Sequence, residues 1–310
     1  MDLVADVLEV SGVRGTVGAR IEAGGSWSIP VAGCTTAILH VVTAGSAWLG
    51  LEDASPRWLE LTVGDVVLMP GGPPHMLGSA SGAGAPAADP ATAARALESG
   101  EVIRLGSQPA RTRILTISYG CDHIVRTQVL GALPELVHIR GDQGEAGFDD
   151  TVRMIGRELG HPLLAGRAVL NSLVDVLLVQ LMRAWLPTRP GHRGTWLGML
   201  ADPLVRSAME RLHAEPAQPW TTTTLASALG VSRATLSRRF PAAIGQSPAT
   251  YLTQWRMDLA AVRLHRTQDP VESIASAVGY QSAPAFNRAF ARSHGVTPGR
   301  YRAERRGDSR

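Results

Sequence analysis

The chain has 310 residues, of which 45% are hydrophobic and 18% charged, a composition typical of a globular protein with two or three domains. Its two cysteines are too few for a disulfide framework. All basic side chains are arginine: residues 195–310 hold 15 Arg and 8 acidic residues, a net charge of +7, whereas residues 1–194 hold 15 Arg and 19 acidic residues, a net charge of −4. An acidic front and a basic C-terminal part indicate a sensor joined to a module that binds a polyanion.

The start of the chain predicts no cleavable secretion signal, because acidic residues at positions 2, 6 and 9 interrupt its apolar residues. The most apolar segment, residues 169–186, contains side chains that a lipid-exposed span would not tolerate, namely Asn171, Asp175, Gln180 and Arg183. We therefore expect a cytoplasmic protein without a membrane partner.

Short apolar runs alternate with polar residues between Thr35 and Met76, and Gly, Pro and Asp separate them. This pattern predicts an antiparallel β-barrel or sandwich. Within it, Gly64-x5-Pro70-x-Gly72-x2-His75 matches the second sequence motif of the cupin barrels. The resemblance implies a strand, a turn and a histidine that points into the barrel.

The first cupin motif normally supplies two His and one Glu ahead of a closing glycine, which is Gly45 here. The corresponding positions of this chain hold Ala32, Cys34 and Ile38. The metal set of an enzymatic cupin is therefore incomplete, which disfavours a metal-dependent cupin oxygenase or isomerase.

A second set of metal ligands remains a hypothesis. Cys34 and His40 share one strand face by the period of two, so Cys34, His40 and His75 converge if that face is interior. Thiolate and imidazole suit zinc or another borderline metal. Cys121 and His123, which share a face of a later strand, complete the candidate effector pocket. Two other interpretations stay open: a pocket for an organic effector, and a redox switch between Cys34 and Cys121.

Residues 77–109 are rich in Ala, Gly and Pro and predict a long surface loop or insertion. Helices are predicted at about residues 147–159 and 163–186, followed by an interdomain linker at residues 187–194.

The second of these helices is apolar on more than one side. One face would pack on the barrel and another on a second subunit, and a core helix within one chain is the alternative. We expect self-association through residues 169–186, with Leu177 and Leu181 in the seam.

The C-terminal part contains an internal repeat. Leu225-Ala-Ser-Ala-Leu-Gly230 matches Ile274-Ala-Ser-Ala-Val-Gly279, and the match continues after one inserted residue. The later pairs are Ser232 with Ser282, Leu236 with Phe286, Arg238 with Arg288, Phe240 with Phe290, Gly245 with Gly295, Pro248 with Pro298, and Tyr251 with Tyr301. Each copy predicts a helix that ends at a left-handed glycine and a second helix that a serine caps.

In each copy the second helix buries an i,i+4 apolar pair, while the paired arginines lie off that stripe. This pattern predicts a helix-turn-helix whose second helix is offered to the major groove. A pair of ordinary helical hairpins with solvated arginines is the alternative, which the close match between the copies disfavours.

Residues 200–305 resemble the DNA-binding domain of the AraC/XylS family, from "WTTTTLASALGVSRATLSRRF" through "SPATYLTQWRMDLAAVRL" to "VESIASAVGYQSAPAFNRAFARSHGVTPGRYR". The resemblance implies two helix-turn-helix units, joined by a rigid helix at about residues 249–266, that read one face of double-stranded DNA. It also implies base-facing residues, which are Arg233, Ala234, Ser237 and Arg238 in the first unit and Ala283, Ala285, Asn287 and Arg288 in the second. Candidate phosphate contacts are Thr222, Thr223 and Ser282.

A cupin-like front ahead of such a tail resembles the cupin-linked subgroup of AraC regulators. We therefore predict an α+β multidomain protein in three parts. These are a cupin-like antiparallel β-barrel that senses an effector (residues 1–128), a helical dimerisation segment (129–190) and an all-α tandem helix-turn-helix domain (191–310).

The predicted function is that of a sequence-specific transcriptional regulator whose front domain senses a small molecule, a metal or a redox signal and shifts a conformational population. A metal-dependent cupin enzyme fused to a DNA-binding domain is the alternative. Expected partners are double-stranded DNA, a small-molecule effector, a second copy of the chain and, if promoters are activated, RNA polymerase. A divalent metal such as zinc is the candidate cofactor.

Overall fold

The computed structural model describes residues 3, 6–7, 10, 13–51, 57–82, 87–89, 91, 94–95, 99–120, 130, 133–141, 147–160, 164–185 and 202–307. The chain forms two compact units. One, which we call the β unit, contains Val13–Cys121 and Leu133–Arg189. The other, the helical unit, contains Met1–Gly12, Asp122–Ala132 and Pro190–Arg310.

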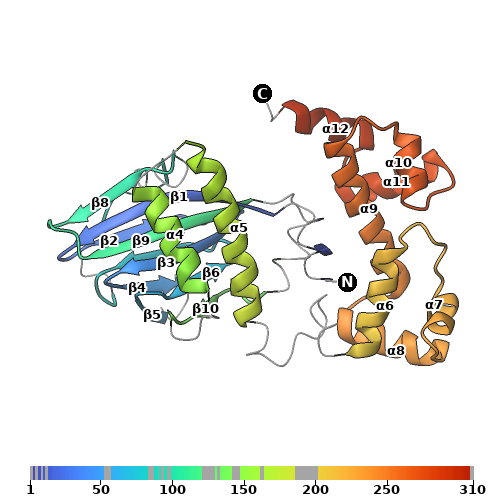
Figure 1. Cartoon of the computed structure of the whole chain (residues 1–310), viewed down its shortest axis with the longest axis horizontal. Helices are drawn as coiled ribbons and strands as arrows, with labels where there is room; N and C mark the ends of the chain where they lie inside the picture. Colours follow the sequence, from blue (N-terminus) through green and yellow to red (C-terminus); the bar gives the residue numbers. More distant parts are fainter. Residues whose placement is uncertain are drawn as a thin grey trace. The chain divides into compact units, whose positions relative to one another are not determined.

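The β unit is built on two sheets (Figure 1). The larger has six strands in the order β10 (Val137–Ile139), β6 (Val66–Met69), β3 (Ala37–Ala44), β9 (Thr112–Gly120), β1 (Arg14–Gly24) and β8 (Val102–Gly106). The smaller has four in the order β2 (Ser28–Val31), β7 (His75–Gly78), β4 (Ser46–Leu51) and β5 (Arg57–Thr62). The predicted cupin-like β domain is confirmed, but its hydrogen-bonded ladders form two sheets and do not close into a barrel.

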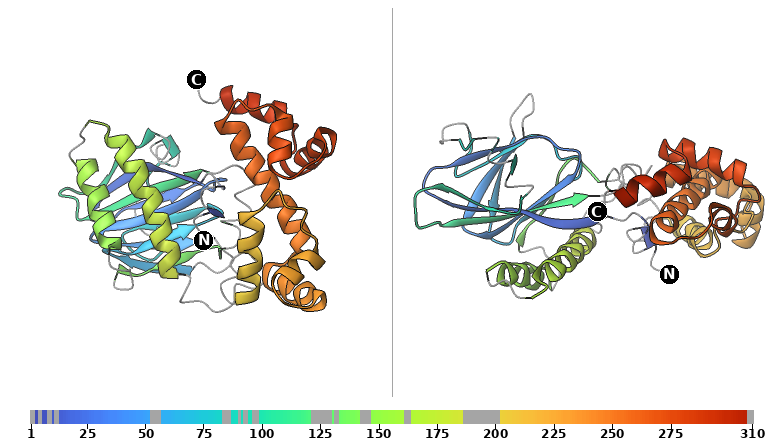
Figure 2. Two further views of the ribbon diagram at one scale, coloured as in Figure 1. Left: turned by 45° about the vertical axis from the view of Figure 1, so that its right-hand side comes forward. Right: turned by 90° about the horizontal axis from the view of Figure 1, so that it is seen from above.

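The space between the sheets is filled by alternate residues of their strands. Ile38 and Val42 of β3 pack there with Ile114 of β9 and with apolar side chains of the smaller sheet. Leu39 and Val41 point to the opposite face and are also fully buried, because helices cover that face of the larger sheet (Figure 2). Each such side chain contributes roughly 1.5–3 kcal/mol of hydrophobic stabilisation.

Both predicted helices of this region are confirmed, as α4 (Phe148–Gly160) and α5 (Gly166–Trp185). The Tyr119 hydroxyl donates to the Val174 carbonyl at 2.6 Å and fixes α5 against the larger sheet. Gly15 makes this close approach possible, because a Cβ there would lie 2.5 Å from Cγ2 of Val174.

The prediction that Leu177 and Leu181 lie in a subunit seam is wrong. Both are fully buried on the face of α5 that packs against the sheet of the same chain. This face also explains why α5 is long and apolar enough to pass for a membrane span by length and composition. The large apolar residues that α5 exposes are Val169 and Val176, whose exposed fractions are 42% and 45%.

The prediction of a single loop at residues 77–109 is wrong in part. Strand β8 lies in this segment and pairs in parallel with the far end of β1, from Arg20 opposite Val102 to Gly24 opposite Gly106. The strand is five residues long and its partner precedes it by about eighty residues, so local periodicity gives little sign of it.

The helical unit contains two helix-turn-helix motifs, as predicted. The first consists of α7 (Thr222–Ala228) and α8 (Arg233–Ile244), and the second of α10 (Val271–Ala277) and α11 (Ala283–His294). Helix α9 (Pro248–Arg266) joins them, and α6 (Pro203–Ala214) and α12 (Pro298–Gly307) complete the described part of the unit (Figure 1). We call the two motifs the first head and the second head.

Glycines end the paired helices in both heads. Gly230 and Gly279 follow α7 and α10 with φ of +68° and +87°, and Gly245 and Gly295 end α8 and α11 with φ of +83° and +73°. These are left-handed conformations that favour glycine, as the repeat predicted.

The predicted serine caps hold in one head and fail in the other. The Ser232 hydroxyl accepts from the amide of Thr235 at 3.1 Å, whereas Ser282 forms no such bond with α11. Pro284 is the second residue of α11 and has no N–H, so one of the two usual donors to the cap is missing.

A loop ties the two heads together within the helical unit. Arg256 of α9 donates to the carbonyls of Pro216 and Gln218 at 2.6 and 2.8 Å. The same loop touches the turn of the second head, because a Cβ on Gly279 would lie 2.7 Å from the carbonyl oxygen of Ala217. The spacing of the heads is therefore fixed by backbone contacts as well as by α9.

Candidate DNA interface and buried histidine pair

Helix α8 of the first head has one buried and one exposed face. Leu236 and Phe240, an i,i+4 pair, are fully buried and anchor the helix in its own small core. All four residues predicted to face bases are exposed, namely Arg233, Ala234, Ser237 and Arg238, and Arg238 lies opposite the buried pair. A helix that enters a major groove requires this arrangement.

The adjacent arginines of α8 have different environments. Arg239 donates to both carboxylate oxygens of Asp202 at 2.9 and 2.6 Å and so joins α8 to α6, whose N-terminus Asp202 caps. Partial burial acts to raise the pKa of Asp202, but the bonds from Arg239 and the α6 amides hold that pKa below its ordinary value. Arg238 has no ion-pair or hydrogen-bond partner among the described residues and is exposed.

Helix α11 of the second head repeats this anchoring with different exposed chemistry. Phe286 and Phe290 are fully buried, with ring centroids 5.7 Å apart. Asn287 and Arg288 are exposed, as predicted, and Arg288 has no partner among the described residues. The predicted base-facing alanines, Ala283 and Ala285, are only half-buried and offer methyl groups alone.

The three candidate phosphate contacts lie at helix starts. Thr223 and Ser282 are exposed, and Thr222 is half-buried. The residue that caps α7 is Thr221, whose hydroxyl accepts from the amide of Thr224 at 3.0 Å while the Thr224 hydroxyl accepts from the amide of Thr221 at 2.9 Å. This capping box was not predicted, although the T-x-x-T spacing of the stretch "TTTT" indicates one.

Helix α9 sets the distance between the heads. It has 19 residues and is therefore about 28 Å long at 1.5 Å per residue. This length and the widths of the two heads are compatible with recognition helices in successive major grooves, which lie about 34 Å apart.

The candidate effector residues His40 and His75 meet between the two sheets of the β unit. His40 on β3 and His75 on β7 are both almost completely buried, and their Nε2 atoms are 2.8 Å apart. Nδ1 of His40 lies 2.9 Å from the hydroxyl of Thr116, and Nδ1 of His75 lies 2.8 Å from the carbonyl of Pro73. The pair is a polar link between the sheets.

The carbonyl of Pro73 can only accept, which sets every proton in this chain of bonds. Nδ1 of His75 donates to Pro73, Nε2 of His40 donates to His75, and the Thr116 hydroxyl donates to His40. Burial lowers the pKa of His40 well below its ordinary value, and the nearby His75 lowers that pKa further. Burial also lowers the pKa of His75, against the opposing effect of the bond to Pro73. Both rings are therefore neutral at neutral pH.

The predicted metal set of Cys34, His40 and His75 does not assemble. Cys34 is exposed ahead of β3, and its thiol lies 3.2 Å from both oxygens of Thr36. Across the described residues no three His, Cys, Asp or Glu side chains gather closely enough to hold a metal. The 2.8 Å between the histidine nitrogens is also shorter than the roughly 3.3 Å between two nitrogens on one tetrahedral zinc. Cys121 and His123 lie outside the described residues.

A two-sheet domain followed by two helix-turn-helix heads on one connecting helix defines a DNA-binding regulator with a separate front domain. Comparison with known proteins agrees. Residues 2–187 match the family model described as Cupin, and residues 225–304 match the one described as Helix-turn-helix domain.

Two relatives match nearly the whole chain. A putative AraC-like transcription regulator of Streptomyces antibioticus is 35% identical over 305 residues, covering 97% of this chain and 98% of that protein. The HTH-type transcriptional regulator MtrA of Neisseria gonorrhoeae is 28% identical over 316 residues, covering 98% and 99%. Among solved structures, the DNA-binding domain of AdpA in complex with a target DNA is similar, with 27% identity, a TM-score of 0.33, and coverage of 34% of this chain and 94% of that one. The chain belongs to the AraC family of DNA-binding transcriptional regulators and has a cupin-like N-terminal domain.

Proposed function

We propose that the two heads bind one face of a single duplex, with α8 and α11 in successive major grooves. The observation that carries this proposal is the repeated design of the heads, in which a buried apolar pair anchors each helix and an uncommitted arginine lies opposite. Base edges would be met by Arg233, Ala234, Ser237, Arg238, Ala283, Ala285, Asn287 and Arg288, and phosphates by Thr222, Thr223 and Ser282.

The two heads divide the recognition unequally in this proposal. Arg238 is flanked by Arg233 and Ser237, so the first head offers several groups that can bond to base edges. Arg288 follows the small residues Ala283 and Ala285, which suits a phosphate contact and apolar contacts with thymine methyls.

The front domain regulates these heads in the proposal by binding a small molecule in the cytoplasm and shifting the population of DNA-binding states. The protein would act as a homodimer, with the exposed side of α5 around Val169 and Val176 as the candidate contact. RNA polymerase is a partner if the protein activates its promoters. A cupin enzyme is not proposed, because the candidate metal set of Cys34, His40 and His75 does not assemble.

Selection from a pool of randomised duplexes tests the DNA-binding proposal. The purified full chain should enrich a motif that spans two successive major grooves, roughly 20 base pairs, and protect one face of it from hydroxyl-radical cleavage. Arg233→Ala should change the enriched bases in one half of the motif only. If no sequence is enriched, or if the motif is confined to one groove, the proposal that both heads bind one duplex is contradicted.

A further inference from the structure

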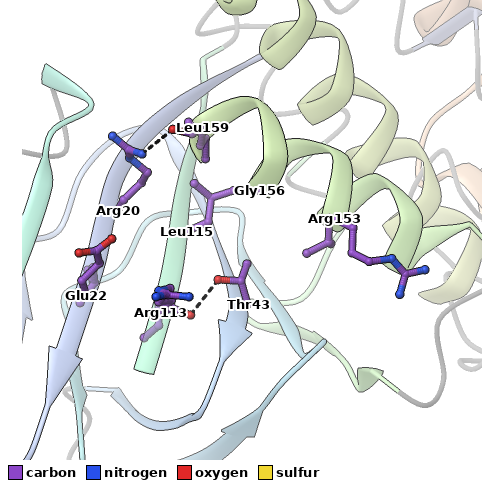
Figure 3. Close-up of a pocket in the computed structure, with 11 residues that line it drawn as sticks. Arg20, Glu22, Thr43, Arg113, Leu115, Arg153, Gly156 and Leu159 are labelled. Atoms are coloured by element: carbon purple, nitrogen blue, oxygen red, sulfur yellow. Dashed lines mark hydrogen bonds between the residues drawn. The ribbon is translucent and has the colours of Figure 1, made fainter. Parts of the chain in front are cut away.

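A pocket lies outside the sandwich, between the helix-covered face of the larger sheet and α4 (Figure 3). Its volume is about 460 Å³, which is in the range of small-molecule sites. The floor comes from β1, β3 and β9 and the wall from one side of α4. It is separate from the space between the sheets, where His40 and His75 meet among packed apolar side chains.

The sheet is irregular on both sides of this floor. Strand β1 shifts register against β9 between Val17 and Arg20, and β3 shifts against the same strand between Val42 and Ala44. Thr43 is the extra residue of the second shift and lines the pocket, where its hydroxyl donates to the carbonyl of Arg113 at 3.2 Å (Figure 3). Bulges of this kind re-aim side chains next to binding sites.

Two guanidinium groups in the pocket, those of Arg20 and Arg113, form no close ion pair with a described residue, although Glu22 is the cross-strand neighbour of Arg113. No carboxylate of the described residues lies within 4 Å of the guanidinium nitrogens of Arg20 or Arg113. Arg20 uses Nη1 to donate to the carbonyl of Leu159 at 3.0 Å, but its buried Nε–H has no hydrogen-bond partner (Figure 3). This nitrogen has almost no accessible surface, so a ligand in the pocket would meet the rest of the Arg20 guanidinium.

The other charged residues of the pocket already have partners. Glu22 lies 3.5 Å from Arg104 on the neighbouring strand, and Arg153 donates to Asp150 on α4. Glu22 repels every negative charge on a ligand, so a monoanion is repelled less than a dianion and suits the pocket better.

The wall formed by α4 is apolar and open. Val152 and Leu159 line it, with Leu115 of β9 opposite. Gly156 lies between them along the helix, and a Cβ on this residue would meet no atom within 4 Å. Glycine in a helix interior costs about 0.5–1 kcal/mol relative to alanine, and here its lack of a side chain leaves room in the pocket that Arg20 and Arg113 line.

We propose that this pocket binds a small organic monoanion, a carboxylate on an apolar body of roughly six to ten carbons. The carboxylate pairs with the guanidinium groups of Arg113 and Arg20, and the apolar body lies along α4 beside Gly156. If the proposed regulation by a small molecule holds, this anion is the effector.

Calorimetric titration of the full chain with cyclohexanecarboxylate tests the pocket. Binding should be at least about tenfold tighter than that of the neutral cyclohexanecarboxamide, which lacks the charge, and of acetate, which lacks the apolar body. Equal affinity for acid and amide, or no detectable binding of the acid, would overturn the proposal.

Two variants locate the binding. Arg113→Gln removes an exposed, unpaired charge and should weaken cyclohexanecarboxylate about tenfold or more. Gly156→Leu fills the wall and should abolish binding while raising thermal stability, because leucine favours helix, so loss of binding cannot be attributed to unfolding. Arg157→Gln, an exposed change on the same helix outside the pocket, is the matched control and should bind normally. Unchanged binding in both pocket variants would refute this location.

Binding of a duplex motif selected by the wild-type chain separates the two proposals. All three variants should select and bind that motif without the acid. If motif binding is intact and the acid does not bind, the pocket proposal alone fails. If the acid binds in the pocket and no duplex motif is enriched, the proposed DNA function fails.

Discussion

The two heads of the helical unit share a scaffold and differ in what they expose. The buried pair Leu236 and Phe240 in the first head corresponds to Phe286 and Phe290 in the second, and all four side chains are fully buried. The exposed faces differ, since Arg233 and Ser237 of the first head have Ala283 and Asn287 as counterparts. Burial therefore constrains the positions that build the fold, and the exposed positions are left to determine what each head recognises.

The largest expected effect tests whether the scaffolds are equivalent. Phe240→Ala and Phe290→Ala each leave a cavity in a small core and should cost about 3–5 kcal/mol of stability. Amide hydrogen exchange should show the loss within the affected head, and Arg211→Ala, an exposed change on α6, should show none. If amide exchange in one head does not increase after its substitution, the two scaffolds are not equivalent.

The next largest expected effect is the loss of stability when alanine replaces glycine at two matching positions of the heads. Alanine at Gly230 or Gly279 is strained by the positive φ, at about 1–2 kcal/mol. Gly230→Ala meets open space, whereas Gly279→Ala places a Cβ 2.7 Å from the Ala217 carbonyl and should cost about 1–3 kcal/mol more. Urea unfolding of the two variants measures the difference in stability. Equal urea midpoints would show that the loop containing Ala217 does not hold the heads together.

The exposed arginines are the third pair. Arg238→Ala should reduce the ratio of operator to scrambled-DNA affinity, by about 1–3 kcal/mol, because it removes the proposed base contact. Arg288→Ala should weaken binding to both DNAs and lower the salt slope by about one unit, because it removes the proposed phosphate contact. Fluorescence anisotropy across a salt series measures both quantities. If neither substitution weakens operator binding in a folded protein, the proposal that both heads bind DNA is wrong.

The smallest expected effect concerns the serine caps. Ser232→Ala loses a hydrogen bond to the Thr235 amide and should cost about 1 kcal/mol, whereas Ser282→Ala loses no cap bond and should be close to neutral. Thermal unfolding of the two single variants is sufficient. A larger loss for Ser282→Ala would indicate that its hydroxyl caps α11 in solution.

The success of sequence reasoning also differs between the two units. In the helical unit the paired helices, their glycine ends and the exposure of Arg238 and Arg288 were predictable, because each depends on residues three or four positions apart. The exception is Ser282, whose hydroxyl forms no cap bond with α11. In the β unit the strands between Thr35 and Met76 and the meeting of His40 with His75 were predictable from period-two alternation and the cupin motif.

The sequence alone determined the family resemblance, the two-headed design and the side of each strand or helix that is apolar, since these follow from local spacing and from the hydrophobic effect. Only the tertiary structure decided what each apolar side meets. It placed Leu177 and Leu181 against the sheet of their own chain, left Cys34 exposed and apart from the histidines, and paired β8 with β1. Strand pairing and helix docking join residues that are far apart in the chain, and many such arrangements satisfy the same alternation. The pocket with Arg20, Arg113 and Gly156 arises in the same way, because its charges and its space come from strands and a helix that only the fold brings together.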